Sequence, residues 1–162
     1  TGELKGDLVE SHEGSNGAKT WVLNLRRGVE FHNGKTLDAD DVITTLNYHR
    51  GESSKSAAKG LLSGISDIRK GSKTQVIFEL SSGNGDFPYL LSDYHLVIMP
   101  AKGGNVDPLA GMGTGPYVMQ SFEPGVKGTF VKKGDKSPLV LIGPVDIIGS
   151  SLFTFKSLYI SP

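Results

Sequence analysis

The sequence contains no cysteine, which removes several functions at once. Disulfide frameworks, zinc–thiolate sites and cysteine nucleophiles all require that side chain. No apolar run reaches about 18 residues, so no membrane-spanning helix is expected. Charge of one sign is lacking as well, because 17 basic and 17 acidic side chains give a formal net charge of +0. That balance indicates neither a nucleic acid nor a membrane surface as a partner.

Glycine, by contrast, is abundant. There are 22 glycines among 162 residues, and 37% of the residues are hydrophobic. The length is sufficient for one domain with its own core. The glycine content indicates many turns. We therefore expect a turn-rich globular protein rather than a disordered segment.

The spacing of apolar residues predicts the first elements. Residues 19–25 alternate, as in a half-buried strand, and 29–31 continue the extended pattern. The Asn33-Gly34 pair indicates a tight turn. Asp38 is expected to cap a helix that runs to about Arg50, with Asp41 in the capping-box position.

The same reasoning covers the rest of the chain. It predicts a helical stretch from Ala57 to Ile65, a strand at 75–80, a short helix at 87–91, a buried strand at 95–99, a glycine-rich loop at 101–113 and a hairpin of 117–122 with 127–132. The apolar stretch from Leu139 to Ile160 is expected to form buried strands. Together these elements predict an α+β fold of short mixed or antiparallel strands with two or three helices.

Three segments in fixed order resemble one protein family. They are WVLNLRRGVEFHNGK at 21–35, LDADDV at 37–42 and GTGPY at 113–117. They are similar to the W-x-F-x-L-R-x-G-V-x-F-H-D/N-G-x, T-A-x-D-V and G-T-G-P-Y elements of the dipeptide, oligopeptide and nickel solute-binding proteins of ABC importers, which are solute-binding protein family 5. The segment 2–11 is similar to the family's lead-in, although Gly6 stands where the family has proline.

The resemblance implies part of a type II periplasmic-binding-protein-like fold, whose members have two lobes that close on a ligand. Residues 1–133 are expected to form a partial first lobe. Residues 134–162 match nothing in the family and are expected to be a divergent or truncated apolar tail. The chain is shorter than family members, so we expect a fragment that does not bind its ligand tightly alone.

The candidate ligand-binding residues are Ser53, Ser54, Lys55 and Ser56, with Tyr94 as a weaker candidate. By family position the serine-rich stretch is expected to face the cleft, where hydroxyls and backbone N–H groups at a helix start can bind a carboxylate. An ordinary solvated helix N-cap is the other interpretation of this stretch, and it is the one that we favour. The four histidines are scattered without metal-ligand spacing, so no metal and no cofactor are expected.

The function implied by the resemblance is capture of a peptide or similar small polar solute in the periplasm or another extracytoplasmic space. Delivery to an ABC permease and ATPase complex would follow, with no bond made or broken, so no enzyme is expected. One alternative is a small serine-dependent hydrolase, although no G-x-S-x-G element occurs. Another is a structural module that self-associates through the apolar tail, because a cut domain leaves unpaired strand edges.

Overall fold

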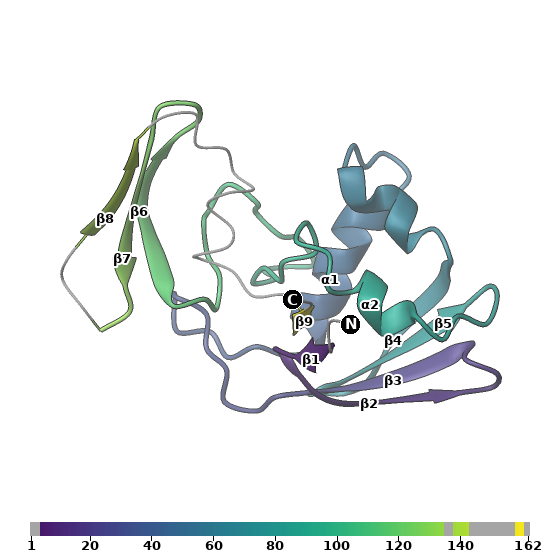
Figure 1. The fold of residues 1–162 in the computed structure, drawn as a ribbon. Coiled ribbons are helices and arrows are strands. Elements are labelled where there is room, and N and C mark those ends of the chain that lie inside the picture. The colour runs from purple at the N-terminus through teal and green to yellow at the C-terminus, as the bar shows by residue number, and fades with distance from the viewer. Residues whose placement is uncertain (1–3, 135–137, 143–157, 161–162) are drawn as a thin grey trace.

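A computed structural model describes residues 4–134, 138–142 and 158–160 of the chain. Its centre is a four-stranded antiparallel sheet in the order β2-β3-β5-β4 (Figure 1). Side chains alternate between the two faces of a strand, and Trp21, Leu23 and Leu25 of β3 are all buried. The four strands span Val9–Ser15 (β2), Thr20–Leu25 (β3), Ile65–Ser72 (β4) and Gln75–Leu80 (β5).

Helix α1 (Ala39–Arg50) contacts this sheet and begins where the sequence predicts. Asp38 accepts the backbone N–H groups of Asp40 and Asp41, and the Asp41 carboxylate accepts the N–H of Asp38. This reciprocal pair is a complete capping box. At the other end, the N–H of Gly51 donates to the carbonyl of Asn47 and closes the helix.

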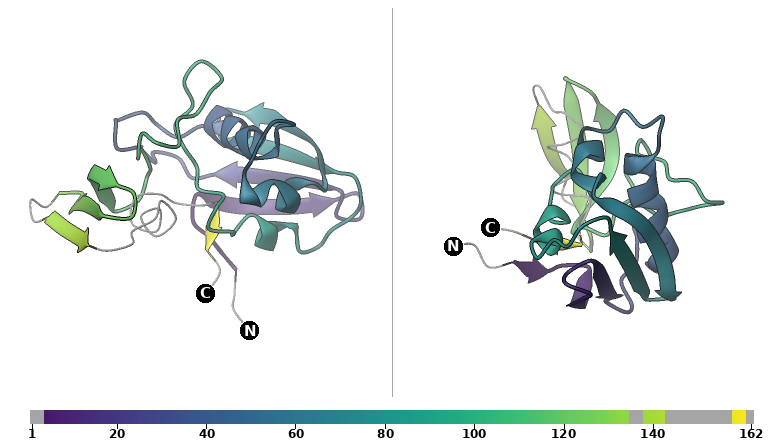
Figure 2. Two further views of the ribbon diagram at one scale, coloured as in Figure 1. Left: turned by 90° about the horizontal axis from the view of Figure 1, so that it is seen from above. Right: turned by 90° about the vertical axis from the view of Figure 1, so that its right-hand side faces the viewer.

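Shorter elements and a second sheet complete the fold. The second sheet has three antiparallel strands in the order β6-β7-β8, and Figure 2 shows it beside one end of the main body. A two-stranded pairing joins β1 to β9, which come from opposite ends of the sequence. The remaining elements are β1 (Lys5–Gly6), the 3₁₀ helix η1 (Ala57–Leu62), α2 (Phe87–Leu90), β6 (Tyr117–Glu123), β7 (Lys127–Lys132), β8 (Pro138–Ile142) and β9 (Tyr159–Ile160).

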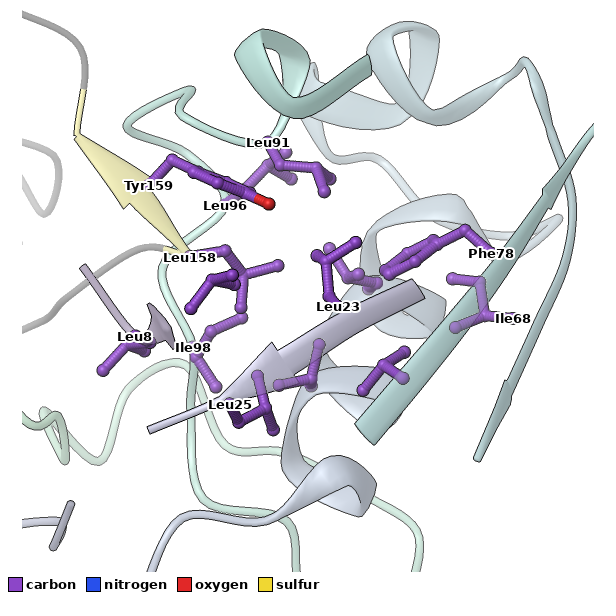
Figure 3. Close-up of a cluster of buried hydrophobic side chains, with 14 of the residues drawn as sticks. Leu8, Leu23, Leu25, Ile68, Phe78, Leu91, Leu96, Ile98, Leu158 and Tyr159 are labelled. Atoms are coloured by element: carbon purple, nitrogen blue, oxygen red, sulfur yellow. The ribbon is translucent and has the colours of Figure 1, made fainter. Parts of the chain in front are cut away.

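The hydrophobic core collects side chains from distant parts of the sequence (Figure 3). Leu23 and Phe78 come from the two central strands, and Leu96 comes from the segment that follows α2. Leu158 and Tyr159, near the end of the chain, are 0% and 1% exposed in the same cluster. Burial of one such side chain contributes about 1.5–3 kcal/mol, so these late residues stabilise the domain substantially.

The described elements confirm the predicted α+β class. The strands at 19–25 and 75–80, the helix capped by Asp38 and the short helix at 87–91 are all present within a residue or two. So is the hairpin around Pro124-Gly125.

One predicted helical residue belongs to a strand. The spacing predicts that Ile65 belongs to the helical stretch that starts at Ala57, but Ile65 begins β4, and η1 ends at Leu62. Gly60 and Gly64 explain the early end, because glycine in a helix costs about 1 kcal/mol relative to alanine. Strand β4 was not predicted at all, because only its residues 65 and 68 are buried and they do not alternate.

The predicted strand at 95–99 is also wrong, although the segment is buried as expected. Its partner is helix α1 rather than another strand. The N–H of Met99 donates to Thr45 Oγ1 at 3.1 Å, and Thr45 Oγ1 donates to the Met99 carbonyl at 3.3 Å. A helix side chain thus supplies the hydrogen bonds that a neighbouring strand would otherwise make.

Part of the apolar tail packs within the chain itself. Strand β8 pairs with β7, and the carbonyl of Leu158 accepts the N–H groups of Asp7 and Val9 at 3.1 and 3.2 Å. Residues 135–137, 143–157 and 161–162 lie outside the described residues, so the strand prediction is confirmed only at β8 and β9. Self-association through this tail is not supported. The boundary near residue 133 stays a prediction.

Candidate functional site

The turn after the tryptophan strand and the late glycine–proline corner meet through His32. The N–H of His32 donates to the carbonyl of Gly113 at 2.9 Å, and the N–H of Gly113 donates to His32 Nδ1 at 3.4 Å. Because Nδ1 accepts, the ring proton lies on Nε2, which donates to the carbonyl of Gly115 at 2.9 Å. Two motifs that are about 80 residues apart therefore form one unit.

Asp41 ties this unit to the start of α1. Its side chain is 0% exposed and accepts Lys35 Nζ at 2.5 and 2.6 Å, the N–H of Asp38 at 2.9 Å and the N–H of Ala101 at 2.7 Å. Burial raises the pKa of the Asp41 carboxyl above its ordinary value, and the bonds from Lys35, Ala101 and Asp38 oppose that shift. All three motif segments are thus held together by His32 and Asp41.

A hollow of about 460 Å³ opens beside this unit. Its walls are the turn at 33–35 and the loop at 100–112, and its volume lies within the range of about 300–1,000 Å³ that small-molecule sites occupy. From its composition this loop is predicted only to be glycine-rich, and the hollow is a feature that the sequence pattern did not predict. The position of the loop in the sequence was the one signal that could have indicated the hollow. The loop runs directly into the GTGPY motif, and that motif contacts the HNGK turn.

The predicted residues Ser53–Ser56 lie at the opposite end of α1. Ser53 and Lys55 are exposed, and Ser54 and Ser56 are half-buried. Ser56 Oγ accepts the N–H of Ala58 at 3.2 Å and caps η1, while Ser54 Oγ accepts the N–H of Ser56 at 3.2 Å. The two half-buried hydroxyls therefore hold the local backbone, and Ser53 and Lys55 are open to solvent.

A buried histidine lies against this stretch. Ser56 Oγ lies 2.7 Å from Nδ1 of His49, which is 7% exposed. Burial, and next the charge of His95, lower the pKa of His49, while Asp93 opposes them.

Tyr94 itself is 50% exposed, and its ring lies 4.0 Å from that of His95, centroid to centroid. His95 Nδ1 lies 2.7 Å from Asp93 Oδ1. The charge of His95 contributes to the lowered pKa of His49, and Ser56 bonds to that same histidine.

The Ser56–His49 pair has the distance expected of a nucleophile and its base, so it bears on the hydrolase alternative. In a catalytic triad the second ring nitrogen of the base donates to a carboxylate. Among the described residues, Nε2 of His49 has no hydrogen-bond partner, and Asp93 bonds to His95 instead. The pair therefore lacks the group that orients a catalytic histidine, and its serine serves as a helix cap.

Two further features are absent from the described residues. No group of three or more histidine, aspartate or glutamate side chains is placed to hold a metal ion there. None of the helices in that part of the chain combines the length and apolar character needed to cross a bilayer.

Comparison with known proteins places these features in one family. Residues 3–138 match the model for bacterial extracellular solute-binding proteins, family 5 Middle. The uncharacterized protein YhjP of Bacillus subtilis is 35% identical over 124 residues, which are 76% of this chain and 20% of that protein. The HTH-type transcriptional regulator SgrR of Yersinia enterocolitica is 30% identical over 118 residues, 72% of this chain and 20% of that protein. The chain thus spans about a fifth of the length of these curated relatives.

Among solved structures, the periplasmic binding protein AgaA from A. tumefaciens R10, in complex with agropinic acid, superposes with a TM-score of 0.69 at 29% identity. The match covers 80% of this chain and 27% of that chain. The likeness confirms the predicted fold class, a partial lobe of a periplasmic-binding-protein-like fold.

Proposed function

Because the chain belongs to the bacterial extracellular solute-binding proteins of family 5, we propose that it is part of the substrate-binding component of an ABC importer. The proposed solutes are peptides or similar small polar molecules, captured outside the cytoplasmic membrane and passed to a permease and ATPase complex. The observation that carries the proposal is the union of all three family motifs around His32 and Asp41.

The proposed solute-facing surface is the stretch Ser53–Ser56 together with Tyr94. Exposed Ser53 and Lys55 offer a hydroxyl donor and a cation, and the half-exposed ring of Tyr94 offers an apolar face. The chain supplies one side of a cleft, and the parts that its longer relatives possess supply the other. Ligand binding would then close the two lobes by a hinge motion.

Binding without chemistry is the mechanism that we propose. His49 lacks a carboxylate partner among the described residues, and Ser56 is committed to capping η1. The family description names binding and no reaction. The solute would therefore be released unchanged, its delivery driven by the shift between open and closed forms.

The experiment is a titration of the isotope-labelled chain with tripeptides, followed through backbone amide chemical shifts. With half of a cleft we expect a dissociation constant weaker than about 0.1 mM, because much of the contact surface is missing. Shifts are expected at Ser53, Lys55 and Tyr94. Tyr94→Ala should reduce them, whereas Tyr89→Ala, which removes a ring of similar exposure, should not. Micromolar affinity, or shifts confined to other residues, would contradict the proposal.

A second candidate function comes from the regulator SgrR, which carries a similar segment. In such a protein the same module would bind a solute as a signal for transcription. Reading the coding sequence on both sides of residues 1–162 separates the two candidates. A secretion leader upstream supports the importer, and a helix-turn-helix domain upstream supports the regulator.

A further inference from the structure

The hollow beside the motif unit is held open by fixed contacts at both ends of its loop. At one end, the N–H of Ala101 donates to Asp41 Oδ1 at 2.7 Å. At the other end, Gly113 exchanges two hydrogen bonds with His32. The wall between them is therefore formed before any ligand arrives, which reduces the entropy that binding would cost.

The inside of the loop also has a fixed conformation. The N–H of Lys102 donates to the carbonyl of Asn105 at 2.9 Å, and Asp107 Oδ1 accepts the N–H of Leu109 at 2.9 Å. Gly111 has a positive φ of 62°, and a Cβ there would lie 1.9 Å from Met119 Cε. Close packing of Gly111 on β6 thus fixes the far end of the wall.

The lining divides into an apolar part and a polar part. Val106, Ala110 and Met112 provide apolar surface. Lys102 and Asn33 provide polar groups at the same hollow.

The charged groups of the lining differ in whether they form ion pairs. Lys35 is neutralised by Asp41. Lys102 Nζ has no ion-pair partner among the described residues, and neither has the exposed Asp107 carboxylate, whose Oδ1 accepts the N–H of Leu109. The Asn33 amide oxygen accepts the N–H of Lys35 at 3.1 Å, which leaves the NH₂ group of Asn33 as a donor. An ammonium and an amide donor beside apolar surface suit an anion that carries an apolar body.

We propose that this hollow is a binding site for small carboxylates with an apolar side chain, such as an acylated amino acid. The carboxylate would bind Lys102 and Asn33, and the side chain would pack on Val106, Ala110 and Met112. The site goes beyond the proposed solute-facing surface, because the two lie at opposite ends of α1. The 12 residues of that helix separate them by about 18 Å.

Three probes test the proposal: N-acetylleucine, N-acetylleucinamide and acetate. N-acetylleucine carries both a carboxylate and an apolar side chain. N-acetylleucinamide lacks the carboxylate, and acetate lacks the apolar side chain. We expect N-acetylleucine to shift the amide signals of Lys102, Asn105 and Ala110, with a dissociation constant in about the millimolar range. The amide and acetate should bind at least about five-fold more weakly, because each lacks one half of the recognition.

Two variants make the test specific to the hollow. Lys102→Gln should weaken N-acetylleucine binding by about five-fold, whereas Lys127→Gln, which removes an exposed lysine on β7, should leave it unchanged. Ala110→Phe should abolish binding by filling the hollow, while the thermal unfolding midpoint stays within about 2 °C because residue 110 is exposed.

The outcomes are decisive in both directions. Saturable shifts around the hollow that disappear in both hollow variants support the site. Equal binding of the acid and the amide, an unaffected Lys102→Gln variant, or no shifts at Lys102, Asn105 and Ala110 at about 50 mM probe overturns it. Shifts at Ser53 and Tyr94 report the other surface, so failure of one proposal is distinguishable from failure of the other.

Discussion

Replacement of Asp41 by asparagine is the sharpest test of how the motifs hold the domain together. The carboxylate of Asp41 is 0% exposed and accepts three donors, from Lys35, Asp38 and Ala101. An asparagine side chain has nearly the same shape, but it offers one oxygen and turns an NH₂ group toward the remaining donors. The Asp41→Asn variant therefore changes hydrogen bonding and charge without opening a cavity.

The expected magnitude follows from the contacts that are lost. A buried N–H left without an acceptor costs about 1–3 kcal/mol, and a hydrogen bond to a charged group contributes about 1.5–3 kcal/mol. We take the lower part of both ranges, because the Lys35 side chain is 34% exposed and can turn to solvent. The free energy of unfolding should fall by about 2–3 kcal/mol, which is a large part of the stability of a typical domain.

Urea unfolding followed by tryptophan fluorescence measures this loss. The chain has one tryptophan, Trp21, which is 7% exposed and packs in the core, so its emission reports global unfolding. With a slope of about 2 kcal/mol per molar urea, the midpoint should fall by about 1–1.5 M.

The neighbouring aspartate supplies a matched control. Asp40 is 57% exposed and pairs with Lys70 at 2.6 Å on the surface. Surface pairs contribute about 0–1 kcal/mol, so Asp40→Asn should lower the midpoint by less than about 0.5 M. Equal losses in the two variants would refute the reasoning that Asp41 organises the motif unit.

Three further predictions concern other parts of the fold. Burial lowers the pKa of His49 below 6.5, so the unfolded chain takes up the proton first. The stabilising contribution of neutral His49 is therefore complete above about pH 6.5 and is lost as the pH falls below that value. The urea midpoint should be lower at about pH 5.5 than at about pH 7.5, and this difference should shrink in the His49→Gln variant. An undiminished difference in that variant would count against the prediction. Gly111→Ala should cost at least about 1–2 kcal/mol in thermal unfolding because of its positive φ, and its Cβ would also displace the Met119 side chain. Gly85→Ala, at a position with open space and no positive φ, is its control and should cost almost nothing; equal costs would argue against strain. Asp38→Ala removes the helix cap and should cost about 1 kcal/mol in urea unfolding; no change would show that the cap is dispensable.

Local signals made the central elements predictable. The alternation around Trp21 and the capping box of Asp38 and Asp41 are each encoded within a few residues. The failures occurred where distant residues decide the outcome. The segment at 95–99 has the composition of a buried strand, but Thr45 takes its hydrogen bonds.

In the candidate sites, too, local features were predictable from the sequence and contacts between distant segments were not. The sequence could place Ser53 and Lys55 on an exposed stretch, because polar composition is a local property. It could not show that Ser56 meets His49 or that Lys102 and Asn33 line one hollow, because these contacts depend on how loops return to the core. The resemblance to the family located the scaffold of the hollow but gave no reason to examine the loop inside it.

The pairing of β1 with β9 has a consequence for protein architecture. Lys5 and Ile160 are direct partners across two antiparallel strands, so the backbone at residue 5 lies about 5 Å from the backbone at residue 160. Linking the two strands by a short glycine-rich bridge, and opening the chain at the exposed turn around Gly125, would give a circular permutant with the same core.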